Sequence, residues 1–240
     1  MKKFAIGLGI LLVIFLTSAG AYLHYLSSSK NDPAFFESAI VAFEASDRES
    51  MPAPGGIVFV GSSSIRFWST LAEDMAPLAV LNRGFGGAHF VHVNHNAARI
   101  VLPYSPRAVV VYAGDNDIGA GTMIADVVGG FTKFVALMHA ELPETEIYYL
   151  PIKPSKLRWK LWDSMSRANG EIMAITQTDA RLHYLDVATP LLNSNREPRD
   201  DVFLLDGLHM NETGYAEWTA VVRPVLIDAW AESATSPAGG

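Results

Sequence analysis

Serine, histidine and aspartate residues occur in this chain in an arrangement that could carry nucleophilic catalysis. Three consecutive serines, Ser62–Ser64, directly follow the apolar run at 57–60, and Asp206 and His209 lie three residues apart in the string DGLH. A serine hydroxyl becomes a nucleophile when a histidine takes its proton and a carboxylate holds that histidine in the correct tautomer. These residue types therefore allow acyl transfer, although ordinary turns would explain the same letters.

Two further strings could supply hydrogen-bond donors to an oxyanion. NRGFGG at 82–87 contains glycines, which let the backbone approach a ligand closely, and GDND at 114–117 contains Asn116, whose amide can donate. Each string alone is also typical of a turn. Asp115 and Asp117 flank Asn116, and paired carboxylates can serve a glycosidase. We expect them instead to brace the loop through hydrogen bonds.

The order of predicted elements places these strings together. Apolar runs predict strands at residues 57–61, 80–81, 108–112, 146–152 and 182–187. A helix is expected to start at Asp32-Pro33, and others are expected at 65–75, 91–102, 124–142, 157–178 and 212–230. Asn211 is a candidate cap for the last of these. Continuous apolar strands alternating with helices indicate a parallel sheet covered on both faces, with chemistry at the carboxyl ends of its strands.

Taken in chain order, the four strings resemble the conserved blocks of the SGNH hydrolases, also called the GDSL family. GSS at 61–63 stands where the family has Gly-Asp-Ser, so the nucleophile falls on Ser63 and Ser62 replaces the usual aspartate. Ala88 stands where many members carry Asp or Ser. The resemblance covers residues 55–230 and implies a triad of Ser63, Asp206 and His209, with an oxyanion hole formed by Ser63, Gly87 and Asn116.

The same resemblance implies the fold and the activity. The fold would be a three-layer α/β/α flavodoxin-like sandwich with five parallel strands in the order 2-1-3-4-5. The activity would be that of a serine esterase, which cleaves a small-molecule, lipid or carbohydrate ester through an acyl-enzyme and needs no cofactor or metal. Two alternatives stay open: an O-acyltransferase using the same residues, and a catalytically silent envelope binding module.

Two other groups of residues are candidates for a role near the site. His89, His92 and His95 recur every three residues after the second string, and we interpret them as a polar helix face near the mouth of the site in preference to a metal site. Arg158 and Trp159, in KPSKLRW at 153–159, follow a predicted strand. They either line the mouth or begin a solvated helix.

The ends of the chain and its composition suggest where the protein acts. Lys2 and Lys3 precede an uncharged apolar run at 4–16, so residues 1–31 predict an export signal or a hydrophobic membrane-anchoring helix plus linker, with the basic end in the cytoplasm. A hydrolase domain at 32–232 and a disordered tail at 233–240 would follow. The domain would be anchored in the cell envelope and face the periplasm or the exterior, or be secreted if the leader is cleaved. The formal charge of −7 disfavours nucleic-acid binding, and the absence of cysteine excludes thiol chemistry. The sequence leaves the oligomeric state open.

Overall fold

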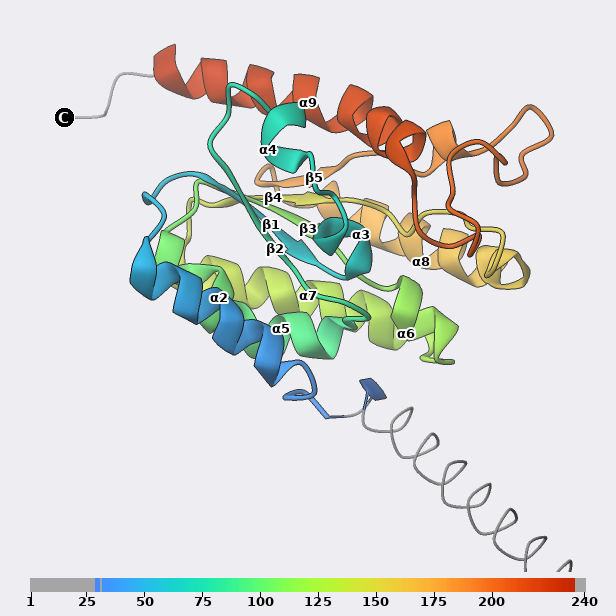
Figure 1. The fold of residues 1–240 in the computed structure, drawn as a ribbon, viewed down its shortest axis with the longest axis horizontal. Helices are drawn as coiled ribbons and strands as arrows, with labels where there is room; N and C mark the ends of the chain where they lie inside the picture. The colour runs from blue at the N-terminus through green and yellow to red at the C-terminus, as the bar shows by residue number, and fades with distance from the viewer. Residues whose placement is uncertain (1–28, 31, 236–240) are drawn as a thin grey trace, which may run out of the picture.

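The computed structural model describes residues 29–30 and 32–235, and Figure 1 gives the labels used below. Its centre is a sheet of five parallel strands in the order β2-β1-β3-β4-β5, which confirms the predicted topology. The strands are β1 Ile57–Gly61, β2 Val80–Gly84, β3 Ala108–Tyr112, β4 Glu146–Tyr149 and β5 Leu182–Tyr184. The predicted N-terminal hydrophobic helix falls within residues 1–28, and the end of the predicted tail within 236–240, both outside the described residues.

Helices cover both faces of the sheet, as Figure 1 shows. Because side chains alternate along a strand, Val58 and Val60 of β1 face one hydrophobic core while Ile57 and Phe59 face the other. The first core is closed by α2 Glu37–Glu49, α5 Phe90–Ile100, α7 Ile124–Glu141 and α8 Trp162–Thr176. The second is closed by α3 Ser63–Arg66, α4 Leu71–Asp74 and α9 Glu212–Thr235. These layers hold the carboxyl ends of β1, β2 and β3 at one edge.

Four helices differ clearly from the predicted ranges. The helix expected to start at Asp32-Pro33 begins as α2 at Glu37, because residues 33–36 form a turn before it. The segment predicted as one helix at 65–75 forms α3 and α4, because Trp68 turns into the second core between them and is 1% exposed. The helix predicted from residue 157 begins as α8 at Trp162, after the short 3-10 helix η2 Trp159–Leu161. At the other end of the chain, α9 continues to Thr235, past the predicted end at residue 230. In the described part of the chain, no helix has both the length and the apolar character needed to cross a bilayer.

Candidate active site

Ser63, His209 and Asp206 form a continuous hydrogen-bonded chain at the carboxyl end of β1. Ser63 is the first residue of α3, and its Oγ lies 3.0 Å from Nε2 of His209. The other ring nitrogen of His209, Nδ1, lies 2.6 Å from Oδ2 of Asp206. The carboxylate accepts a hydrogen bond from Nδ1–H. Nε2 therefore carries no proton and faces the serine hydroxyl as an acceptor. The structure thus brings together three residues that are up to 146 positions apart in the chain.

A tight turn fixes the carboxylate beneath the imidazole. Gly207 adopts φ of +63°, a left-handed conformation that glycine tolerates without strain. This lets Oδ1 of Asp206 accept hydrogen bonds from the backbone N–H groups of Leu208 and His209, both at 2.9 Å. Burial opposes ionisation of this carboxyl, but the hydrogen bonds from the His209 side chain and from the two backbone N–H groups outweigh it and lower the pKa of Asp206 to about 2. Asp206 is therefore a carboxylate at any ordinary working pH.

Phe67 also positions the imidazole, and the sequence patterns did not single it out. Its ring meets the ring of His209 edge to face, with 4.9 Å between the centroids. The Phe67 side chain is 46% exposed, which is unusual for a large aromatic residue and places it at the rim of the site. The sequence does show that Phe67 lies four residues after the candidate nucleophile. One helical turn would bring the two residues to the same side.

The two serines beside Ser63 have other surroundings. Ser62 and Ser64 are buried, at 0% and 2% exposure, whereas Ser63 is only partly buried. The carbonyl of Ser64 accepts a hydrogen bond from the Tyr215 hydroxyl at 3.0 Å, which ties α3 to α9. The hydroxyl of Ser62 has no hydrogen-bond partner among the described residues. Only the middle serine combines access to solvent with contact to the imidazole.

The predicted oxyanion donors lie on the loops after β2 and β3. Gly87 has φ of +74°, and a side chain there would be strained. Within residues 32–235, the backbone N–H groups of Ser63 and Gly87 donate no hydrogen bond to the protein. The side chain of Asn116, in α6 Asp115–Gly119, donates from Nδ2 to the carbonyl of Ala88 at 3.2 Å. Two free N–H groups and one amide are the donor types that an oxyanion hole requires.

A buried group of charges lies behind Asn116. Asp115 Oδ2 is 3.2 Å from Nη1 of Arg158 and 3.5 Å from Nζ of Lys153, whose side chain is 1% exposed. Burial opposes ionisation of Asp115, but Lys153 and then Arg158 outweigh it and hold its pKa below the ordinary value. Asp115 therefore braces the loop as predicted. Lys153 was not expected to take part. Trp159, which we expected either to line the mouth or to begin a solvated helix, lies in η2 and stacks on Trp162.

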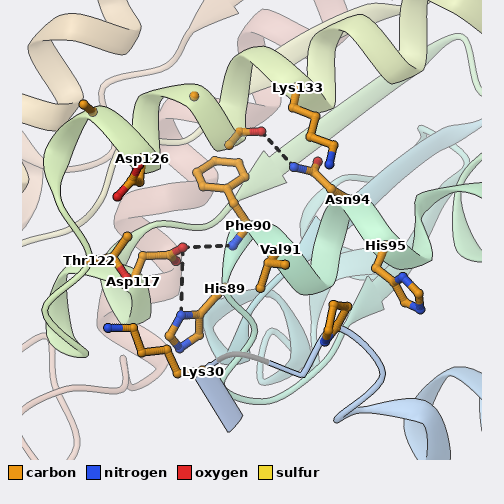
Figure 2. A pocket seen from close by; sticks show the side chains of 14 residues that line it. Lys30, His89, Phe90, Val91, Asn94, His95, Asp117, Thr122, Asp126 and Lys133 are labelled. Carbon is orange, nitrogen blue, oxygen red and sulfur yellow. Dashed lines mark hydrogen bonds and ion pairs between the residues drawn. The ribbon is translucent and has the colours of Figure 1, made fainter. Parts of the chain in front are cut away.

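Asp117, on the other side of Asn116, braces the start of α5. Its Oδ1 accepts the backbone N–H of Phe90 at 3.1 Å and lies 3.9 Å from Nδ1 of His89. Figure 2 shows these contacts in the wall of a cavity of about 620 Å³, which Lys30 and Lys133 also line. Burial raises the pKa of Asp117 to about 7. The predicted bracing role of both aspartates is confirmed.

The prediction of a polar helix face for the three histidines is wrong for two of them. His89 is 7% and His92 is 0% exposed, because His92 packs against Phe36 and His89 lies beside Asp117. Nδ1 of His92 accepts the backbone N–H of His89 at 2.9 Å, which closes the first turn of the helix. Burial lowers the pKa of both rings to about 4, so both are neutral near pH 7. Only His95 lies on the exposed side.

One known enzyme family matches more than half of the chain. The sequence model of the GDSL-like lipase/acylhydrolase family matches residues 56–217, which span β1 to the first part of α9. The chain belongs to this family. The GDSL-like family consists of ester-hydrolysing enzymes, and the matched residues include every position predicted for the triad and the oxyanion hole. The resemblance inferred from the four strings is thereby confirmed.

Solved structures share the fold of this GDSL-like protein at low sequence identity. A Streptococcus pneumonia protein provisionally described as a platelet activating factor is 16% identical, with a TM-score of 0.75 over 88% of this chain and 99% of its own. A GDSL-like lipase from Bacteroides thetaiotaomicron is 18% identical, with a TM-score of 0.69 over 80% and 98%. A carbohydrate esterase family 3 protein from Talaromyces cellulolyticus is 17% identical, with a TM-score of 0.58 over 74% and 99%. No curated protein matches the chain.

Proposed function

We propose that this protein is a serine esterase that cleaves carboxylic esters through a covalent acyl-enzyme on Ser63. The observation that carries the proposal is the chain from the Ser63 hydroxyl through His209 to Asp206, with contacts of 3.0 and 2.6 Å. Membership of the GDSL-like family supports the same class of reaction. A short acyl group on a carbohydrate or a lipid is the substrate class that we favour.

The reaction proceeds in two displacements. His209 takes the proton of the Ser63 hydroxyl as Oγ attacks the ester carbonyl, and it then gives that proton to the departing alcohol. The N–H groups of Ser63 and Gly87 and the Asn116 amide bind the negative oxygen of each tetrahedral intermediate. In the second displacement, His209 activates water, which attacks the acyl carbon and returns the carboxylic acid and free Ser63. Asp206 keeps the imidazole in one tautomer and stabilises its charged form in both steps.

Labelling with a fluorophosphonate, combined with ester hydrolysis, tests the proposal. The wild-type protein is expected to form a covalent adduct on Ser63 and to release p-nitrophenol from its short-chain esters. Ser63→Ala should lose both signals, while the matched variant Ser64→Ala should keep most of each, because only the backbone of Ser64 holds Tyr215. An unlabelled wild-type protein that is correctly folded would favour a silent binding module.

The O-acyltransferase alternative differs only in what attacks the acyl-enzyme. An alcohol acceptor would replace water in the second displacement, and the products would be a new ester and free Ser63. Adding glycerol or a monosaccharide to the hydrolysis assay separates the two outcomes. An esterase yields mainly free acid, whereas a transferase yields the acylated acceptor.

We also propose that the protein acts in the cell envelope, with its N-terminal segment in the membrane. The support lies in the sequence, where Lys2 and Lys3 precede the apolar run at 4–16. Cell fractionation should recover the full chain with membranes, and the mass of the mature N-terminus would show whether the segment is cleaved. Replacing Leu11 and Leu12 by aspartate should move the chain out of the membrane fraction. Recovery of the wild-type chain among soluble cytoplasmic proteins would contradict this location.

A further inference from the structure

Arg158 makes a direct contact with the amide that is proposed to bind the oxyanion. Its Nη2 donates a hydrogen bond to Oδ1 of Asn116 at 2.9 Å. Arg158 lies between β4 and α8, whereas Asn116 follows β3, so the contact joins two loops that are 42 positions apart in the chain. The Arg158 side chain is 20% exposed, so most of it is buried beside the site.

The contact fixes which way the Asn116 amide faces. A guanidinium has only donors, so the group that faces it must be the amide oxygen and not the amide nitrogen. Nδ2 is therefore turned to the opposite side, where one of its protons meets the carbonyl of Ala88 and the other remains for a ligand. Arg158 also places a positive charge behind the amide.

Two further contacts hold the guanidinium in this position. Oδ2 of Asp115 forms an ion pair with its Nη1 at 3.2 Å, so the fork of Arg158 contacts two neighbouring residues of α6. The guanidinium also lies across Gly119, because a Cβ added there would come within 2.9 Å of Arg158 Nε. The missing side chain at Gly119 therefore leaves the space that the guanidinium occupies.

From these contacts we infer that Arg158 is a positioning residue for the oxyanion hole: it orients the Asn116 amide and strengthens it as a donor to the negative oxygen of the tetrahedral intermediate. The inference rests on the proposed esterase function. It assigns to Arg158 a role in the transition state rather than in substrate binding. The loss of Arg158 should therefore lower kcat and leave KM nearly unchanged.

The first test compares Arg158→Met with Arg181→Met in hydrolysis of p-nitrophenyl acetate. Removing a whole oxyanion donor typically costs about 10²–10³ in kcat, so losing its orientation should cost about tenfold or more. Arg181 is the matched control, because it also clamps a nearby aspartate, Asp179, but does so at the start of β5. An equal kcat for wild type and Arg158→Met would overturn the inference, as would a change confined to KM.

The second test asks whether Arg158 acts through Asn116. In an Asn116→Ala background, Arg158→Met should lower kcat much less than it does in the wild-type protein, because the amide that Arg158 orients is gone. Full additivity of the two losses would show that Arg158 acts elsewhere and would overturn the inference. If the wild-type protein neither hydrolyses esters nor labels at Ser63, the proposed function itself fails, and that result is distinct from both outcomes.

Gly119→Ala provides a second variant in case Arg158→Met does not fold. Gly119 lies at the end of α6 without a positive φ, so alanine suits its backbone, and only the flexible end of Arg158 must move. We expect a lower kcat at an unchanged melting temperature, and no further loss when Arg158→Met is added. An unchanged kcat in Gly119→Ala with a displaced guanidinium in its crystal structure would overturn the inference.

Discussion

At the scale of single residues, the site depends on hydrogen bonds that fix one tautomer of one imidazole. Asp206 accepts three hydrogen bonds, one from the His209 ring and two from backbone N–H groups. The two backbone contacts prevent the carboxylate from rotating away from Nδ1. The geometry that makes the serine a nucleophile is therefore built into a turn of four residues, DGLH.

Asp206→Asn tests the role of this carboxylate. Asparagine can still accept the two backbone N–H groups, so the turn should persist, but its amide can donate to the imidazole and favour the wrong tautomer. We expect kcat to fall by about 10⁴-fold with the melting temperature nearly unchanged. Asp200→Asn is the control, because this exposed carboxylate pairs with Lys156 at the surface. A fall of less than tenfold in Asp206→Asn would contradict the assignment.

At the scale of elements, α5 carries a buried imidazole that makes the fold sensitive to acid. Burial holds the pKa of His92 at about 4 in the folded protein, against an ordinary value of 6.5. Between these values the unfolded chain binds more protons than the folded one, so the free energy of unfolding falls as pH is lowered from about 6.5 to about 4. Asp117, with its raised pKa, acts in the opposite direction.

His92→Gln is expected to reduce this acid sensitivity. Melting temperatures measured at about pH 8 and about pH 4.5 should differ less in His92→Gln than in the wild type, because one of the groups that take up a proton on unfolding is gone. His95→Gln is the matched control, since His95 lies on the same helix and is exposed. All of these proteins contain Asp117, so its opposing effect cancels in the comparison. Equal pH dependence in all three would contradict the prediction.

The cap of α9 supports the loop that holds His209. Asn211 Oδ1 accepts the backbone N–H of Gly214 at 3.1 Å, as the predicted cap requires, and its Nδ2 donates to the carbonyls of Asp201 and Phe203. Asn211→Ala should lower the free energy of unfolding by about 1–2 kcal/mol or more, measured by urea denaturation. Asn211→Ser keeps the cap but not the two contacts made by Nδ2, so its free energy of unfolding should fall by less. Equal losses in both variants would show that the cap itself contributes nothing.

The sequence predicted the elements well where local pattern decides and poorly where distant contacts decide. The ranges of β1 and β3 were predicted exactly, because each is a continuous apolar run with polar residues directly after it. The break between α3 and α4 was not predicted, since it depends on distant contacts: Trp68 enters the second core, and Asn82 of β2 donates to the carbonyl of Ile65 at 2.7 Å. The Arg158–Asn116 contact could not be predicted for the same reason: no local pattern pairs two loops.

The site residues were easier to predict than their supports. The triad and oxyanion positions occupy four short strings, each of which could be an ordinary turn, but in chain order the four together resemble one family. Phe67 and Lys153 were missed because an aromatic residue just after a short helix and a lysine in a loop are common in every fold. Their roles come from burial and from neighbours that only the tertiary structure supplies.

At the scale of the whole molecule, one sheet supports two separate hydrophobic cores. Phe131 and Phe134 of α7 are fully buried in the core beneath α5 and α7, and Trp218 of α9 is fully buried in the other. The strands connect both cores through alternating side chains. A substitution that weakens the packing of one core should therefore lower the free energy of unfolding of the whole domain.

Phe131→Ala tests this coupling. Removing a fully buried aromatic ring typically costs about 3–5 kcal/mol, so the free energy of unfolding should fall by that amount in one cooperative transition. The kcat of the folded protein should change little, since Phe131 contacts none of the triad. Met123→Ala, at an exposed position, should leave stability unchanged. Separate transitions for the two layers would contradict the expectation.

The length of α9 has a practical consequence for handling the protein. This helix of 24 residues begins beside the His209 loop and ends at the opposite side of the molecule, as Figure 1 shows. At about 1.5 Å per residue, the helix is roughly 36 Å long, and its end lies well away from the His209 loop. Coupling to a resin, an electrode or a reporter through the C-terminus should therefore leave the entrance open to bulky polymers.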